Sequence, residues 1–177
     1  IRPCIACMTC LHMLFTRRPM ECLINPCVGR EHEFALKKVK IPKKVMVIGG
    51  GPAGMEAARV AALRGHKAIL YEKNDRLGGQ LNLAFLPPHK EEIKGLIKYL
   101  TTQIEKLGIE VHCEKKAEVP IIAQEKPDVV IVATGAVPFI PKVKGVELQH
   151  VFTSWDVLSG KANRIGKRVV VAGAEHL

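Results

Sequence analysis

The stretch that decides the fold is residues 45–54, which read VMVIGGGPAG. Its first four residues are wholly apolar, which predicts a short strand buried on both faces. The next six contain the pattern G-x-G-x-x-G, directly before a predicted helix over residues 53–64. In such a loop Gly49 permits a tight turn, Gly51 lets the backbone approach a pyrophosphate, and Gly54 lets the helix pack closely on the strand. The stretch therefore predicts a dinucleotide site that opens an α/β domain.

A carboxylate follows the glycine loop at a spacing that suits the ribose of a dinucleotide. Glu72 ends a second predicted strand, Lys67–Tyr71, and seventeen residues separate it from Gly54. A carboxylate in this place can accept both hydroxyls of an adenosine ribose and would repel a 2′-phosphate. The free N–H groups at the start of the helix would hold the phosphates. The predicted ADP site consists of Gly49, Gly51, Pro52, Ala53, Gly54, Glu72 and Lys73.

Two further glycine turns favour FAD over NAD, which the loop alone does not separate because both cofactors carry ADP. The first is LGGQ at residues 77–80, placed as in flavoproteins whose second backbone segment approaches the flavin side of the cofactor. The second follows a predicted buried strand over 129–133 and resembles the Ala-Thr-Gly turn of two-dinucleotide flavoproteins. The residues expected to approach bound FAD are Gly79, Gln80, Thr134 and Gly135.

Apolar runs and amphipathic stretches alternate through the rest of the chain. Runs at 109–113 and 168–172 predict further strands, and apolar residues at helical spacing over 93–107 predict a helix. This alternation is typical of a parallel sheet covered by helices. The predicted fold class is therefore α/β, a Rossmann-like FAD/NAD(P)-binding domain with a parallel sheet, preceded by an irregular iron–sulfur segment.

The cysteines predict a metal site near the amino end. Five of the six lie within the first 27 residues, and Cys4, Cys7 and Cys10 have a spacing that lets a short loop wrap a [4Fe–4S] cubane. Cys22 is the expected fourth ligand and Cys27 the alternative. Zinc is the competing metal, although tetrahedral zinc sites usually take two ligands from each of two separated turns. Clustering without secretory features favours a metal site in a reducing compartment over disulfides.

Composition argues against two other classes of function. The net charge of +10 invites a nucleic-acid partner, but the basic residues are dispersed and only 5% of residues are aromatic. Anionic cofactors would offset part of this charge. No apolar run approaches the roughly 20 residues that span a bilayer, and the early cysteines interrupt any signal-peptide core. We expect a cytoplasmic protein that binds neither nucleic acid nor membrane.

Taken together, the cysteines and the glycine loop resemble one family. The runs IRPC at 1–4, CLINPCVGRE at 22–31, LPPHKEE at 86–92 and ATG at 133–135 are similar to the NADH:flavin oxidoreductases that include 2,4-dienoyl-CoA reductase, enoate reductase and trimethylamine dehydrogenase, an old-yellow-enzyme-like family. The resemblance extends over nearly the whole chain. It implies an oxidoreductase in which electrons pass between NAD(P)H, FAD, a [4Fe–4S] cluster and FMN.

The resemblance also implies a domain plan. Residues 1–36 would form the cluster segment, 37–44 a lysine-rich linker, 45–150 the first half of the FAD-binding domain, and 151–177 a linker with the opening strand of a truncated NAD(P)-binding domain. Its partners would be an upstream TIM barrel that carries FMN and the substrate site, and the downstream NAD(P) domain. The intact protein could be a homo-oligomer, and this fragment is not expected to be active alone.

Carried over to matching positions, the resemblance assigns site residues and leaves an alternative open. No catalytic residue is named, since the substrate chemistry would lie in the barrel, and Ala117 would offer its backbone to the adenine. The two-residue gap between Cys7 and Cys10 is more like the trimethylamine dehydrogenase branch, where the corresponding domain can hold ADP without a working flavin. The alternative function is therefore a structural ADP-binding module. The implied cluster ligands are Cys4, Cys7, Cys10 and Cys22.

Overall fold

The computed structural model describes residues 1–162 and 165–173. The chain divides into two compact units, Ile1–Gly135 and Ala136–Leu177. The first unit contains a parallel sheet with its covering helices, and the second contains one short helix, α6. In these described ranges, no helix is both long and apolar enough to cross a membrane.

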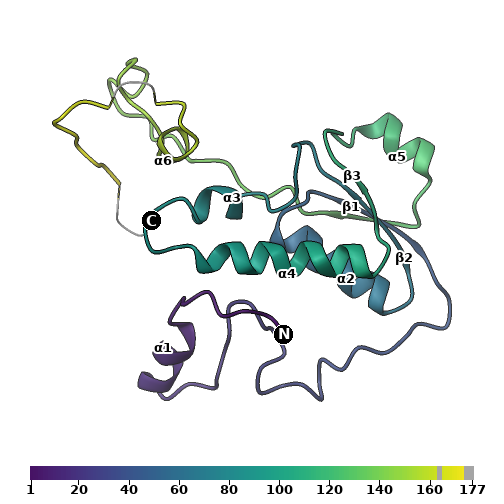
Figure 1. Cartoon of the computed structure of the whole chain (residues 1–177). Helices are drawn as coiled ribbons and strands as arrows, with labels where there is room; N and C mark the ends of the chain where they lie inside the picture. Colours follow the sequence, from purple (N-terminus) through teal and green to yellow (C-terminus); the bar gives the residue numbers. More distant parts are fainter. Residues whose placement is uncertain (163–164, 174–177) are drawn as a thin grey trace. The chain divides into compact units, whose positions relative to one another are not determined.

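The sheet of the first unit has four parallel strands in the order β3-β2-β1-β4 (Figure 1). In register, Met46 of β1 lies opposite Ile69 of β2 on one side and opposite Val130 of β4 on the other. The predicted α/β fold with a parallel sheet is confirmed, and four of the five predicted strands agree with the observed bounds to within one residue at each end. These strands are β1 (Lys44–Ile48), β2 (Lys67–Tyr71), β3 (Glu110–His112) and β4 (Val129–Val132).

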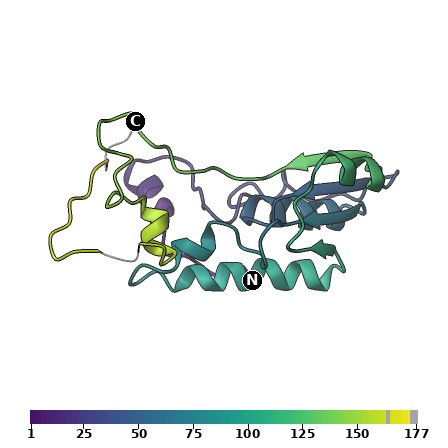
Figure 2. The ribbon, with the colours of Figure 1, turned by 90° about the horizontal axis from the view of Figure 1, so that it is seen from above.

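Helices cover both faces of this sheet, with α2 (Pro52–Leu63) and α4 (Glu92–Lys106) on one face and α5 (Val119–Glu125) on the other (Figures 1 and 2). The α4 helix buries Leu96, Leu100 and Ile104, which are four residues apart and so share one side of the helix. The predicted helices over 53–64 and 93–107 are each displaced by one residue from these bounds.

Alternation along the strands divides the core into two layers. Val45 and Val47 of β1, with Leu70 of β2, pack among the α2 and α4 residues. Met46 and Tyr71 point to the opposite face, where residues of α5 cover them. Because both sides of β1 are buried, its sequence is a continuous apolar run rather than an alternating one.

Tyr71 ties the second layer to the end of α5. Its hydroxyl donates to Oε1 of Glu125 at 2.9 Å, and Lys44 makes an ion pair of 2.8 Å with Oε2 of the same carboxylate. Burial, followed by this hydrogen bond, raises the pKa of Tyr71 to about 12. The folded chain therefore holds the phenol proton more tightly than an unfolded chain, in which the pKa is about 10.

This difference predicts a loss of stability at alkaline pH. The contribution of Tyr71 is fully present below about pH 10 and disappears as the pH rises toward about 12. We expect Tyr71→Phe to flatten the fall in the free energy of unfolding between these two pH values, measured by denaturant titration. It should also remove the late step in tyrosinate absorbance that Tyr71 contributes. A variant with an unchanged alkaline slope would contradict the assignment.

The predicted burial of the strand over 129–133 is wrong. Val129, Val130 and Val132 of β4 are 37%, 36% and 70% exposed. Among the described strands β4 pairs only with β1, so it forms an edge of the sheet. An apolar run shows that a strand can be buried, but its burial depends on elements that lie elsewhere in the chain.

Short helices lie in segments for which the sequence analysis predicted no helix. The cysteine segment contains α1 (Thr9–Phe15), and α3 (Leu81–Ala84) follows the second glycine turn. No residue of either helix is buried, so neither helix has the regular spacing of apolar residues from which a helix is predicted. In the second unit α6 (Ser154–Leu158) begins with a capping box, in which Thr153 and Asp156 each bond the other's backbone N–H.

The strand predicted at 168–172 does not form. Val169, Val170 and Val171 are 60%, 92% and 86% exposed, and the described residues supply no strand to pair with them. A strand needs a hydrogen-bonded neighbour, so an apolar run by itself does not make one. The residues that follow Gly173 lie outside the described part of the chain.

Candidate functional site

The first glycine loop has the geometry of a tight strand-to-helix turn. Gly49 follows β1 with φ at +112°, and its N–H donates to the backbone oxygen of Tyr71 at 2.8 Å. A β-carbon on Gly54 would fall on the carbonyl oxygen of Gly49, so α2 can approach the loop only with glycine there. The helix begins at Pro52 after the N-cap Gly51, which leaves its first N–H groups directed out of the turn.

The second glycine turn packs directly on the first. The N–H of Gly78 donates to the carbonyl oxygen of Gly50 at 2.9 Å. A β-carbon on Gly79 would lie 2.8 Å from the Cα of Gly51, so the two backbones approach too closely for a side chain at position 79. The structure thus brings together the loop expected at the pyrophosphate and the turn expected toward the flavin.

The turn after β4, residues 133–135, also packs beside the first glycine loop. A β-carbon on Gly49 would fall on the carbonyl oxygen of Ala133, and one on Gly135 would lie 3.2 Å from Nε2 of Gln80. Thr134, between Ala133 and Gly135 in the sequence, is exposed. Three segments far apart in the sequence therefore meet at the carboxyl ends of β1 and β4, where ligands of parallel sheets bind.

Glu72 is the one buried charged residue among those that the structure describes, with 4% of its surface exposed. Its Oε2 accepts from the N–H of Gly50 at 2.6 Å. Its Oε1 accepts from the N–H and the Nδ2 of Asn74, at 2.8 and 2.7 Å. Both lone pairs of Oε1 are therefore occupied, and one acceptor site on Oε2 remains for a hydroxyl donor. Glu72 thereby joins the end of β2 to the glycine loop.

The sequence analysis did not predict the contacts of Glu72 with Asn74 and with Gly50. Asn74, two residues beyond Glu72, supplies both donors to Oε1, and the E-x-N spacing is the local signal that could have indicated it. Gly50 occupies a position that the glycine pattern leaves unspecified. A β-carbon there would lie 2.5 Å from Leu77 Cδ2 and 2.9 Å from Oε2 of Glu72, so the carboxylate itself restricts this position to glycine.

The remaining predicted cofactor residues lie around Glu72. Lys73 is exposed. Ala117 packs against the layer that contains Met46 and Tyr71. The segment leading to Ala117 runs beside the end of β2, since the N–H of Lys115 donates to the backbone oxygen of Glu72 at 2.9 Å. Contact of Lys73 or Ala117 with a nucleotide stays a prediction.

Replacing Glu72 tests how much the loop depends on this carboxylate. In Glu72→Gln an N–H group must face either Gly50 or Asn74, which are both donors. We expect the free energy of unfolding to fall by about 1–3 kcal/mol, because a buried donor loses its acceptor. Denaturant titration measures the change, and Glu114→Gln, at an exposed position, is the matched control. Equal stability of the two variants would contradict this role.

Cys4 and Cys7 lie on a loop before α1, Cys10 lies in the first turn of α1, and one backbone amide of the loop donates to sulfur. Ala6 and Met8 have left-handed backbones, with φ at 52° and 61°. The N–H of Ala6 donates to Sγ of Cys4 at 3.4 Å. Alternating left-handed residues form concave sets of N–H groups, which are found at phosphate and iron–sulfur sites.

Cys7 has the most polar surroundings of these thiols. Its sulfur lies 3.4 Å from the Thr9 hydroxyl. Hydrogen bonds from the Thr9 side chain first, then from the backbone of Thr9 and of Leu23, hold the pKa of the Cys7 thiol below its ordinary value. Because Leu23 follows Cys22 directly, the same contact places the first cysteine group beside the expected fourth ligand. Lowered thiol pKa values suit metal binding, which requires the thiolate.

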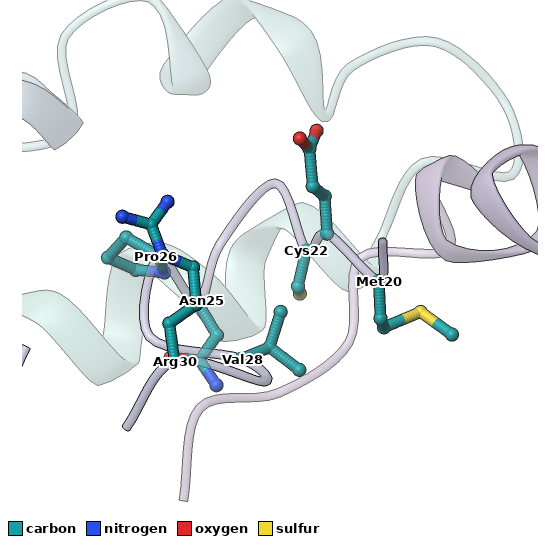
Figure 3. A pocket seen from close by; sticks show the side chains of 7 residues that line it. Met20, Cys22, Asn25, Pro26, Val28 and Arg30 are labelled. Carbon is teal, nitrogen blue, oxygen red and sulfur yellow. The ribbon is translucent and has the colours of Figure 1, made fainter. Parts of the chain in front are cut away.

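Cys22 borders a pocket of about 230 Å³ that residues 20–30 form. Figure 3 shows its sulfur directed toward Val28, with Asn25 and Arg30 on one side and Met20 on the other. All six cysteines of the chain are free thiols; Cys4, Cys7 and Cys10 are exposed, while Cys22 and the alternative Cys27 are half-buried.

Thiols are the ligand type that an iron–sulfur cluster takes. Within the part of the chain that the structure describes, no three His, Cys, Asp or Glu side chains lie close enough together to hold one metal ion. Ligands of a cubane bind four different irons and stand farther apart than ligands of one zinc ion. Free thiols, one of which accepts from a backbone amide, are of the ligand type that such a cluster takes, and the ligand set itself stays a prediction.

Comparison with known proteins places this arrangement in a family. The sequence model described as pyridine nucleotide-disulphide oxidoreductase matches residues 43–175. The chain belongs to this family. The matched part includes the sheet, the three glycine turns and Glu72, but not the first five cysteines, which precede residue 43.

Relatives extend the match to the cysteine segment. The chain is 41% identical to a bilirubin reductase of Mediterraneibacter gnavus over 98% of this chain and 27% of that protein. It is 44% identical to an NADH oxidase of Thermoanaerobacter brockii over 92% of this chain and 26% of the relative. A solved 2-naphthoyl-CoA reductase complex superposes with a TM-score of 0.86 at 39% identity, covering 89% of this chain and 24% of that one.

The predicted resemblance to the old-yellow-enzyme-like NADH:flavin oxidoreductases is thereby confirmed. The chain spans about a quarter of the length of the curated relatives it matches. It is an oxidoreductase domain of the kind found in these larger, multidomain flavin enzymes.

Proposed function

We propose that this chain is the FAD- and [4Fe–4S]-carrying electron-transfer module of an NAD(P)H-dependent flavin oxidoreductase. The observation that carries the proposal is the meeting of three glycine turns beside buried Glu72, in a unit that also holds four cysteines with cluster spacing. In the intact protein, an FMN-binding substrate barrel and an NAD(P) domain would be its electron partners.

The protein's own part in this chemistry is binding and placement. Gly51 would let the pyrophosphate reach the start of α2, whose dipole stabilises negative charge. Glu72 would accept a ribose hydroxyl at the remaining lone pair of Oε2, and Cys4, Cys7, Cys10 and Cys22 would hold iron. When bound, FAD supplies exchange between two-electron and one-electron steps, and the cluster carries single electrons.

Reconstitution of the chain tests this function. The purified protein is incubated without oxygen with iron, sulfide and FAD, then desalted and analysed for iron, sulfide and nucleotide. We expect bound FAD, about four iron atoms per chain in a brown protein, and bleaching of the cluster absorbance after photoreduction of the flavin. A colourless product that holds neither iron nor nucleotide would overturn the proposal.

A second candidate is the structural ADP-binding module. The chain is 31% identical to a dimethylamine dehydrogenase of Hyphomicrobium over 97% of this chain, and its Cys7 to Cys10 spacing resembles that branch. Competition between FAD and ADP separates the two functions. Retention of ADP together with iron, and release of FAD on desalting, would favour the structural module.

A further inference from the structure

The Arg2 side chain joins three separate parts of the first unit. Its two terminal nitrogens donate to the backbone oxygen of Ile24 and to Oε1 of Glu56, each at 2.5 Å. The guanidinium also lies 5.7 Å from the ring centroid of Tyr99, on α4. Only 17% of the side chain is exposed. An arginine so placed fixes the positions of its partners, because its rigid fork binds them in one geometry.

Glu56 is itself fixed on α2 by a second arginine. Arg59 donates from two nitrogens to the two oxygens of Glu56, each at 2.8 Å. Burial alone would raise the pKa of Glu56, but hydrogen bonds from Arg59 and then Arg2, with their positive charges, outweigh it and lower the pKa. The carboxylate therefore stays charged between the two guanidinium groups and is a rigid acceptor for Arg2.

Apolar contacts support the same attachment. Ile5, between the first two cysteines, and Ile24 both pack against the core layer formed with α2 and α4. Pro3 rests on α4, where a β-carbon on Gly95 would lie 3.4 Å from its Cγ. The cysteine segment is thus attached to the helices by side chains on both sides of its metal-binding positions.

The sequence positions of these residues show which segments Arg2 connects. Arg2 comes two residues before Cys4, and Ile24 two residues after Cys22. Glu56 comes two residues after Gly54, in the first turns of the helix that begins at the glycine loop. One side chain therefore connects the backbone around the first and the fourth expected cluster ligands to the helix expected to hold the dinucleotide.

We propose that Arg2 is a positioning residue that, through Glu56, fixes the cluster-binding segment to α2 and so sets the distance between cluster and FAD. The inference rests on the proposed function and adds to it the residue that aligns the two cofactors. Electron transfer slows steeply as the distance between two redox groups grows. By fixing the cluster-binding segment to α2, Arg2 would therefore control the rate of electron transfer without contact with either cofactor.

Alkylation of Cys27 in the iron-free chain tests the attachment directly. Cys27 is half-buried and close enough to Arg59 for their charges to interact, so its reactivity reports whether the segment rests on α2. The variant Arg2→Met keeps the apolar stem and removes the charged fork. We expect Cys27 to be alkylated about tenfold faster or more in Arg2→Met, because a charged hydrogen-bond pair no longer opposes local opening. Arg2→Lys, which keeps the charge, should give an intermediate rate.

The matched control is Glu33→Gln, which breaks the exposed ion pair between Arg30 and Glu33 in the same segment. In reconstituted protein, Arg2→Met should lose iron to a chelator faster and pass electrons from photoreduced flavin to cluster more slowly, with FAD affinity unchanged. Alkylation and iron loss equal to those of Glu33→Gln would overturn the inference. A parent chain that takes up no iron would defeat the proposed function instead, while Cys27 alkylation would still decide the attachment.

Discussion

Replacing Cys10 with serine is expected to leave the reconstituted chain nearly free of iron. A hydroxyl is a far weaker ligand for iron than a thiolate, and the loop from Cys4 to Cys10 has no spare thiol to take its place. Because a cubane binds through all its ligands, loss of one should weaken the others as well. We expect iron content after desalting to fall more than about tenfold, measured by iron and sulfide assays and by the absorbance of the cluster.

Two further serine substitutions make this test specific. Cys113→Ser should retain the parent's iron content, since Cys113 follows β3 and lies far in sequence from the other cysteines. Comparison of Cys22→Ser with Cys27→Ser decides between the expected fourth ligand and its alternative. If Cys10→Ser and Cys113→Ser retain equal iron, the cluster assignment is wrong.

The second large effect is expected at Gly51, where substitution should separate nucleotide binding from folding. The backbone of Gly51 has φ at −73°, which any residue adopts, and a β-carbon there would lie 3.9 Å from its nearest neighbour, the Cα of Gly79. Gly51→Ala should therefore leave the free energy of unfolding close to that of the parent. The added methyl group would occupy the place where the pyrophosphate reaches the loop.

We expect the affinity for FAD, or for ADP, to fall about 10- to 100-fold in Gly51→Ala, since an added methyl group in a filled site costs about 1–3 kcal/mol. Fluorescence quenching of FAD and calorimetric titration with ADP measure this change. Gly54→Ala is the contrasting variant, because its β-carbon would fall on the Gly49 carbonyl and disturb the fold itself. If a folded Gly51→Ala protein binds nucleotide as tightly as the parent does, the assignment of the pyrophosphate to this loop is wrong.

Local patterns predicted the part of the fold that local geometry controls. The glycine loop, Glu72 and the first two strands could be placed from the sequence because a tight turn, a ribose acceptor and a buried parallel strand each require particular residues at fixed spacing. The structure brings Gly79 against Gly51, and Ala133 against Gly49, while contact of Gly79 and Gly135 with a cofactor stays a prediction.

What the sequence did not predict depends on distant partners. The exposure of β4 follows from its place at the edge of the sheet, and the run at 168–172 stays unpaired because no strand among the described residues neighbours it. The contacts of Arg2 with Glu56 and Ile24 join positions more than twenty residues apart, which no periodicity reveals. Helix α1 buries none of its residues and so has no amphipathic pattern.

The open side of β4 has a practical consequence for every titration described above. A row of backbone N–H and C=O groups, flanked by outward-facing valines, is a template on which a second molecule can add a strand. Self-association through this template should grow with protein concentration and would mimic tight binding by trapping ligand in oligomers. Dilute samples, checked by light scattering, are therefore the condition under which affinities for iron and nucleotide can be compared between variants.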